Sequence, residues 1–150
     1  MRKIFFSALV VVLAACASSN KTAKVDIPQP EITVDQLSNT PAVAEHVTGG
    51  VPIYLGMSVT NRADIPITLK RVNIQSMGSG GYNVPAQSHP IDKVITPEGT
   101  DQEQFWVSSF ATQSVAGVNG AVALRVIAQF DSPKGAFETV TVHQVTGRIP

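Results

Sequence analysis

The sequence predicts an all-β protein consisting of a single β-sandwich of about seven strands. Three observations support this fold class. After Glu31 the dominant spacing of apolar residues is two, turn-forming residues separate the alternating runs, and no amphipathic pattern reaches the length of a three-turn helix. Short strands at such spacing are typical of a sandwich rather than of a barrel or an α/β sheet.

The strongest alternation surrounds Leu124 and Val126. These two side chains are expected to face the interior, while Arg125 and Gln129 face solvent. Ile127 lies on the same face as the polar residues although it is apolar. Either a loop covers it, which we favour, or it belongs to a surface that contacts a partner.

The remaining strands are predicted from shorter versions of this pattern. Val72 and Ile74 are expected on one face of their strand, with Leu69 and Arg71 on the other. Residues 109–115 could form a short helical turn. The predicted strands are 32–37, 53–59, 68–76, 91–95, 104–108, 122–130 and 136–145, and the turn signals between them fall at 61–64, 78–81, 97–99, 117–120 and 131–135.

A signal sequence precedes the domain. Arg2 and Lys3 supply its positive charge, and the apolar run that follows would reach only about 18 Å as a helix, short of a hydrocarbon core of roughly 30 Å. The chain contains one cysteine, Cys16, and the run Leu13-Ala14-Ala15-Cys16 resembles the bacterial lipobox. That resemblance implies cleavage after Ala15 and attachment of lipid to Cys16, so that the mature protein is anchored to a membrane.

The anchor also implies a location. Cys16 is followed by Ala17 and Ser18 rather than by the aspartate that marks inner-membrane retention in the enterobacterial sorting rule. We therefore expect an outer-membrane lipoprotein that faces the periplasm. The expected organisation is a signal peptide at 1–15, the lipidated cysteine with a flexible polar tether at 16–30, and the sandwich domain at 31–150.

Composition excludes one large class of partner. The chain has 11 basic and 11 acidic residues, and removing Arg2 and Lys3 with the leader leaves a net charge of −2. Lys70-Arg71 is the one adjacent basic pair that remains, so we expect no nucleic-acid binding. A single cysteine also rules out an intramolecular disulfide. No cofactor is expected.

A family resemblance adds to the fold prediction. The stretch Val59-Thr60-Asn61-Arg62-Ala63-Asp64-Ile65-Pro66-Ile67-Thr68-Leu69, with Val72 and Ile74, resembles the type 2 late-embryogenesis-abundant (water-stress) domains. The run Ile95-Thr96-Pro97-Glu98-Gly99 before Phe105 and Val107 fits the same pattern. Arg62 stands where that family usually has a proline after the asparagine. The resemblance covers about 55 residues and implies an immunoglobulin-like or fibronectin-III-like sandwich, with no functional residue carried over.

Catalytic and metal-binding patterns are weak. His46, His89 and His143 are far apart and have no second ligand at metal-binding spacing, so we expect no metal site. Asp101 and Glu103 would share one face of a strand, and paired carboxylates can hydrolyse glycosides. A solvated edge before a core strand is the simpler interpretation. No nucleophile has a neighbouring base, so no catalytic residue is assigned.

Three residues are candidates for a contact surface. Tyr82 follows a glycine-rich turn and could either contact a partner or cap the sandwich. Trp106 must lie on the opposite face of its strand from Phe105, so one of the two faces outward or packs under a loop. Ile127 is the third candidate, for the reason given above.

These observations lead to three functional hypotheses. The first is a lipid-anchored, non-enzymatic binding or assembly module that presents an edge strand or a loop end to another protein of the cell envelope. The second is a small hydrolase of cell wall or glycan on the same scaffold. The third, which the family resemblance implies, is a stress-protective structural lipoprotein.

Overall fold

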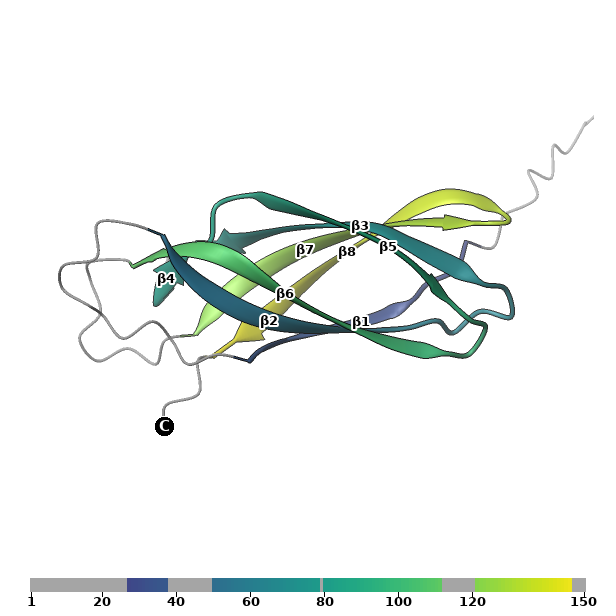
Figure 1. Ribbon diagram of the computed structural model, residues 1–150, viewed down its shortest axis with the longest axis horizontal. Helices are drawn as coiled ribbons and strands as arrows, with labels where there is room; N and C mark the ends of the chain where they lie inside the picture. Colours follow the sequence, from purple (N-terminus) through teal and green to yellow (C-terminus); the bar gives the residue numbers. More distant parts are fainter. Residues whose placement is uncertain (1–26, 38–49, 79, 112–120, 147–150) are drawn as a thin grey trace, which may run out of the picture.

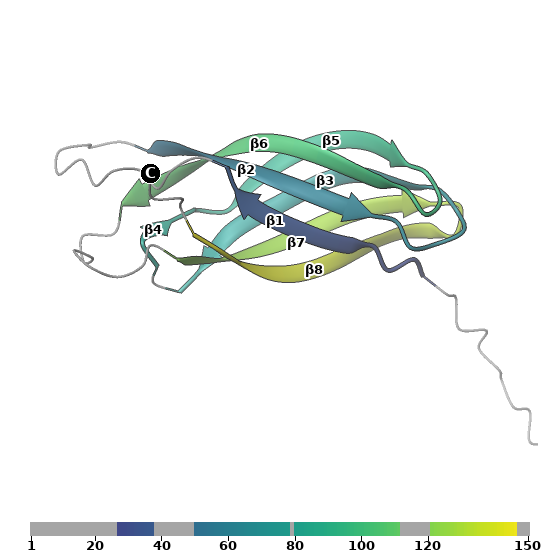
Figure 2. The same ribbon diagram turned by 90° about the horizontal axis from the view of Figure 1, so that it is seen from below.

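The computed structural model describes residues 27–37, 50–78, 80–111 and 121–146. Within them the chain forms eight strands and no helix, arranged as two antiparallel four-stranded sheets (Figures 1 and 2). This confirms the predicted all-β sandwich. The strands are β1 (Glu31–Gln36), β2 (Val51–Thr60), β3 (Ile67–Met77), β4 (Tyr82–Asn83), β5 (Gln87–Ile95), β6 (Thr100–Ala111), β7 (Val122–Ser132) and β8 (Gly135–Val145).

Most strands that follow one another in sequence lie in different sheets; the exceptions are the hairpin pairs β1–β2 and β7–β8. We call the sheet with order β1-β2-β6-β4 sheet A and the sheet with order β5-β3-β7-β8 sheet B. Every connection from β2 to β7 passes from one sheet to the other, so the two layers are bound together by their connections. Figure 2 looks onto sheet A, with β1, β2 and β6 in front of the strands of sheet B and β8 along one rim of the molecule.

The core lies between the sheets and follows the period-two pattern. Every second residue of β7 is buried from Val122 to Phe130, and Leu124 and Val126 are fully enclosed, as predicted. Arg125 and Gln129 lie on the other face and are partly exposed. The facing residues of sheet A come mainly from β2, where alternate side chains from Ile53 to Val59 are buried. Burial of apolar surface at about 25 cal/mol per Å² is the main stabilising contribution.

One face assignment is wrong. Leu69 was expected opposite Val72 and Ile74, but all three are buried in the core. The reason is a β-bulge between Leu69 and Arg71, where the pairing of β3 with both neighbouring strands shifts. One extra residue, Lys70, breaks the alternation, so the apolar face continues on both sides of the bulge.

The limits of the domain also differ slightly from the prediction. Pro28 and Pro30 are buried, so the packed part of the chain begins before Glu31. Residues 109–111 belong to β6 and are not part of a helical turn, while 112–115 lie outside the described residues. The other predictions that lie outside them concern the leader, Ala15, Cys16, His46 and the turn at 117–120.

Candidate functional site

The outer face of sheet A carries exposed aromatic side chains. Tyr54 of β2 and Trp106 of β6 are directly paired across the two strands, and both point away from the core. Phe110 follows on the same face of β6, and Leu37 extends the group beyond the end of β1. These four side chains are each between 45% and 57% exposed. We call Leu37, Tyr54, Trp106 and Phe110 the aromatic face.

The local sequence explains how this face is built. The backbone N–H of Leu37 donates to the carbonyl of Tyr54 at 2.8 Å, which holds Leu37 beside β2 after β1 has ended. Gly56 leaves the room that Leu37 occupies, because a Cβ at Gly56 would lie 3.2 Å from the Leu37 side chain. An open hollow of about 310 Å³ lies next to the aromatic pair and is lined by Gly50, Pro52, Tyr54, Trp106 and Ser108.

Trp106 therefore faces outward, and its neighbour Phe105 lies on the inner face. The remaining members of the aromatic face, Leu37, Tyr54 and Phe110, were not among the predicted contact residues. The sequence contained a signal for Tyr54, since it is an aromatic residue on the solvent side of a clearly alternating strand. It held no indication that Tyr54 and Trp106 are neighbours, because the register between β2 and β6 is a long-range property.

Tyr82 is not a surface residue, which corrects its selection as a contact candidate. It is 1% exposed, and its hydroxyl donates to Gln36 Oε1 at 2.7 Å, so it closes the core at the end of the sandwich. Burial raises the pKa of Tyr82 to about 12. The physical reason is that β4 has only two residues, so no periodic pattern could predict that the ring of Tyr82 is directed into the core.

Ile127 lies on the outer face of sheet B and is partly buried there. It is paired with Val140 of β8 and with Asn73 of β3. Val140 and Val142 are about half exposed beside it. Ile127 is therefore part of a second apolar strip, on the opposite side of the molecule from the aromatic face.

The acidic pair is engaged in an ion cluster. Lys93 Nζ of β5 lies 3.0 Å from Asp101 Oδ1 and 2.8 Å from Glu103 Oε1 of β6. As expected, the two carboxylates share one face of their strand. Their proximity raises the pKa of Lys93, with the hydrogen bond to Glu103 as the largest cause. Both carboxylates are therefore engaged by the same ammonium group, in ion pairs that join β5 to β6.

This ion cluster belongs to a seam that closes the β5–β6 side of the sandwich. The ring of His89 lies 4.8 Å from the ring of Phe105, and the side-chain amide of Gln87 exchanges two hydrogen bonds with the backbone of Ser108, at 2.8 and 2.9 Å. Burial lowers the pKa of His89. Side chains therefore join the two sheets here, because β5 and β6 are not hydrogen-bonded to each other as paired strands.

The two histidines in the described part of the chain, His89 and His143, do not converge. His143 Nε2 lies 2.8 Å from the Thr141 hydroxyl on β8. Burial lowers the pKa of His143, and the negative charge of Asp35 offsets part of this decrease. His89 is on β5, at the other side of the sandwich. Among the described residues no group of three or more histidine, cysteine, aspartate or glutamate side chains could hold a metal ion.

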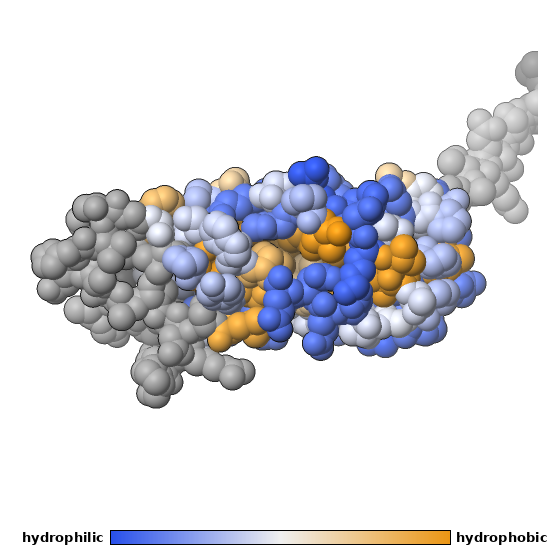
Figure 3. Space-filling view, viewed as in Figure 1, coloured by the Kyte–Doolittle hydropathy of each residue, from blue (hydrophilic) through white to orange (hydrophobic). Residues whose placement is uncertain are grey.

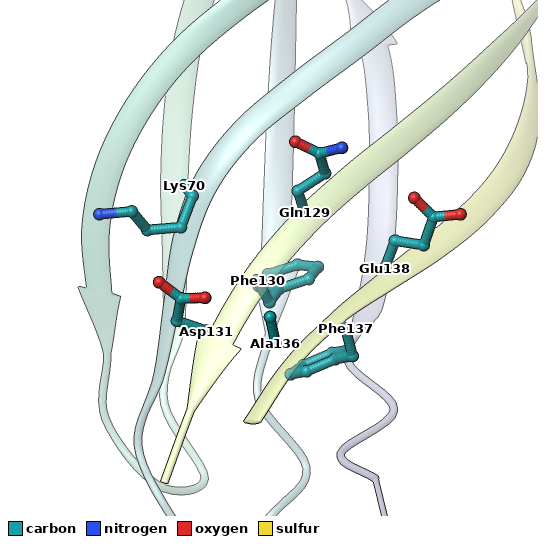
Figure 4. Close-up of a pocket in the computed structure, with 7 residues that line it drawn as sticks. All are labelled: Lys70, Gln129, Phe130, Asp131, Ala136, Phe137 and Glu138. Carbon is teal, nitrogen blue, oxygen red and sulfur yellow. The ribbon is translucent and has the colours of Figure 1, made fainter. Parts of the chain in front are cut away.

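A second hollow, of about 360 Å³, lies at the end of sheet B near the β7–β8 turn. Its lining includes Phe130 and Phe137, whose rings are stacked with centroids 5.1 Å apart, together with Lys70, Asp131 and Glu138 (Figure 4). Lys70 is already paired with Asp92, which raises the pKa of Lys70. No pair of neighbouring acids, or of nucleophile and base, converges among the side chains that line this hollow.

The rest of the surface is mixed. On the side shown in Figure 3, hydrophobic residues form separate groups between hydrophilic ones. None of the described segments forms an apolar helix that could span a bilayer. The aromatic face is therefore the strongest candidate for a functional site.

The described strands form a small antiparallel β-sandwich, and comparison with known proteins agrees on this fold. A structural-genomics target named SoR45 covers 79% of this chain and 86% of its own, with a TM-score of 0.55 and 9% identity. A Bordetella pertussis structural-genomics target, given the name ApaA, covers 82% of this chain and 97% of its own, with a TM-score of 0.55 and 12% identity. At such identities the similarity shows the fold alone.

A late-embryogenesis-abundant protein solved in solution is also similar, with 16% identity over 85% of this chain and 76% of its own. With a TM-score of 0.41, this similarity supports no conclusion about the family or the function of the present chain. No protein-family model and no curated protein matches the sequence. The functional argument therefore depends on the chain's own residues.

Proposed function

We propose that this protein is a lipid-anchored, non-enzymatic binding module of the bacterial cell envelope, and that its aromatic face binds another envelope protein. The single observation that carries the proposal is the half-exposed Tyr54–Trp106 pair on the outer face of sheet A, with an open hollow beside it. Tyrosine and tryptophan are enriched at the centres of protein interfaces, where they contribute much of the binding energy.

The geometry favours binding over catalysis. The cross-strand pairs of sheet A hold Tyr54 and Trp106 in fixed positions, so little conformational entropy is lost when a partner covers them. The acids that a glycan hydrolase would use are occupied by Lys93, away from the hollow beside the aromatic pair. The role of a stress-protective lipoprotein is supported by no feature of the described surface.

The location belongs to the same proposal. A lipid on Cys16 would hold the domain at the outer membrane on its periplasmic side, within reach of proteins in that membrane. Two or three acyl chains give an anchor that does not dissociate, whereas one chain binds reversibly.

Replacing Cys16 with serine tests the anchor. We expect the C16S protein to lack lipid and to be either uncleaved at Ala15 or released as a soluble form, because a hydroxyl cannot replace the thiol that accepts the glyceryl group. The measurement is membrane fractionation together with the mass of the mature chain. Unchanged membrane retention of a C16S chain that has lost its leader would contradict the lipoprotein assignment.

Photo-cross-linking tests the binding surface in the full-length lipoprotein. A benzophenone side chain at position 106 should yield a specific adduct with an envelope protein, and the same group at Val94, which is exposed on sheet B, should not. Trp106→Ser should then reduce co-purification of that protein about thirtyfold, since truncation of a central aromatic contact typically costs 2 kcal/mol or more. Equal adducts at both positions would contradict the proposal.

The fluorescence of Trp106 provides a direct second readout. The chain has one tryptophan, so its emission reports on this position alone. Because the side chain is exposed, the free protein should emit at long wavelength and be quenched readily by acrylamide. Addition of the purified cross-linked partner should shift the emission to shorter wavelength and protect it from quenching. A partner that leaves both unchanged does not bind at the aromatic face.

A further inference from the structure

The outermost strands of the two sheets differ in how they are protected against pairing with another chain. An outer strand exposes unpaired backbone N–H and C=O groups, and proteins block such edges with prolines, charges, bulges or short strands. In sheet A, β4 has only two residues, and β1 has six, with Glu31 and Asp35 on its outward face. Both edges of sheet A are therefore short.

The β5 edge of sheet B is protected in three ways. Pro90 has no backbone N–H to donate, and Asp92 adopts a left-handed conformation with φ of 62°, which distorts the strand. Lys93 points inward to the ion cluster with Asp101 and Glu103. Inward-pointing charge and proline are features that prevent the addition of a strand.

The β8 edge has none of these features. It is paired with β7 over eleven residues without a register shift. No described strand is hydrogen-bonded to its other side, and β1 of sheet A lies close to it without pairing. The run from Thr139 to Val145 contains neither proline nor a carboxylate, lysine or arginine, and is rich in β-branched residues. In Figure 2, β8 forms the rim of the molecule, and β1 of the other sheet lies inside that rim. Because β8 is long and regular, and has no carboxylate, lysine or arginine from Thr139 to Val145, it can accept another strand.

The outward face of β8 carries two exposed valines within the uncharged run from Thr139 to Val145. Val140 is 49% exposed and Val142 is 56% exposed, and Ile127 of β7 is paired with Val140. The three side chains form a strip that reaches the free edge of the sheet. On the inward face, Thr139, Thr141 and His143 are partly exposed at the rim, so polar side chains line the other side of the same edge.

The sequence of β8 is complementary to itself. In an antiparallel pair centred on Thr141, Val140 of each copy lies opposite Val142 of the other, and Thr139 lies opposite His143. The one acidic residue of β8, Glu138, lies just before this run, opposite Gln144 and not opposite its own copy. Outward residues meet outward residues throughout, because each pair joins positions of equal parity.

We propose that β8 is a dimerisation edge, which pairs with β8 of a second copy of this chain about a two-fold axis at Thr141. The two copies of sheet B then form one continuous eight-stranded sheet, with the valines of both copies in contact on its outer face. Such an interface is isologous, since the same residues contribute from both sides. It lies on sheet B and leaves the aromatic face of sheet A open.

Disulfide cross-linking in native membranes tests this arrangement in the full chain. Thr141→Cys places two thiols opposite each other across the two-fold axis, at a Cβ separation of about 4.5–5.5 Å, from which a disulfide can form with small shifts. We expect mild oxidation to give a disulfide-linked homodimer. The wild-type chain, with Cys16 alone, gives the background. The matched control is Val94→Cys, an exposed position on the β5 edge of the same sheet, which reports random collisions.

A charge substitution in the Thr141→Cys chain provides the second measurement. Val142→Lys should reduce the cross-linked fraction at least about tenfold, equivalent to about 1.4 kcal/mol, because lysine on an outer strand opposes pairing. Val94→Lys, the same change on the β5 edge, should leave it unchanged. Circular dichroism confirms that both lysine variants are folded.

Three results would overturn the proposal. The first is a Thr141→Cys homodimer no more abundant than that of Val94→Cys. The second is no reduction by Val142→Lys. The third is a disulfide between Thr141→Cys and a different protein in place of the homodimer, which would show that β8 accepts a strand from another chain.

Discussion

Replacing Leu124 with alanine is expected to lower the free energy of unfolding by about 2 to 5 kcal/mol. Leu124 lies in the middle of β7 with no exposed surface, between Ser76 of β3 and His143 of β8. The cost has two parts, the lost transfer energy of the methyl groups and the cavity that rigid neighbouring strands cannot close. A small domain has only about 5 to 15 kcal/mol in total, so this loss is severe.

Two substitutions on the same strand serve as controls. Gln129→Ala, on the outer face of β7, should change the free energy of unfolding by about 0.5 kcal/mol or less. Ile127→Ala should fall between the two, because Ile127 is partly buried beside Val140. Urea denaturation should be followed by circular dichroism, since exposed Trp106 changes its environment little on unfolding. If Gln129→Ala is more damaging than Leu124→Ala, the faces of β7 are assigned the wrong way round.

The faces of β2 and β7 could be predicted because burial on one side imposes a period of two that is visible without knowledge of any partner. The same reasoning failed at Leu69, since a bulge inserts one residue into the pairing without a local signal in sequence. It also failed at Tyr82, whose strand is too short to show any period. Local patterns therefore specify which side of a strand faces inward, but not where the pairing is interrupted.

The candidate surfaces are less predictable than the core. The Tyr54–Trp106 pair depends on the register of β2 against β6, and the accessibility of β8 depends on its being last in its sheet. Both properties arise from strand order, which alternation does not encode. The ion cluster at Lys93 shows the same limit. The sequence places Asp101 and Glu103 on one face, but the cation that neutralises them comes from a different sheet.

Asn61 illustrates how a sequence resemblance can reflect structure. It ends the Val-x-Asn stretch that resembles the water-stress domains, and it is a fully buried polar residue. Its side-chain nitrogen donates to the carbonyls of Ile65 at 2.8 Å and Thr96 at 3.1 Å, with that of Ile95 at 3.4 Å. Its side-chain oxygen accepts from the backbone N–H of Ala63 at 3.0 Å. The side-chain amide of Asn61 therefore joins the turn between β2 and β3 to the residues at the end of β5.

Asn61→Ala is expected to lower the free energy of unfolding by about 2 to 4 kcal/mol, because several buried or partly buried backbone groups lose their partner at once. Thermal and urea denaturation measure the loss. Asn83→Ala is the control: Asn83 is exposed and accepts a hydrogen bond from Ser76, so its replacement should cost about 0.5 kcal/mol or less.

Asn61→Asp distinguishes the contribution of the amide nitrogen, which donates hydrogen bonds, from that of the amide oxygen, which accepts one. Aspartate retains the oxygen that accepts from Ala63 but loses the donors, and at neutral pH it places a negative charge beside the carbonyls of Ile65 and Thr96. It should therefore destabilise the domain at least as much as alanine does, since a buried charge without a partner is costly. A stability of Asn61→Asp close to that of the wild type would show that the donated hydrogen bonds do not hold this corner together.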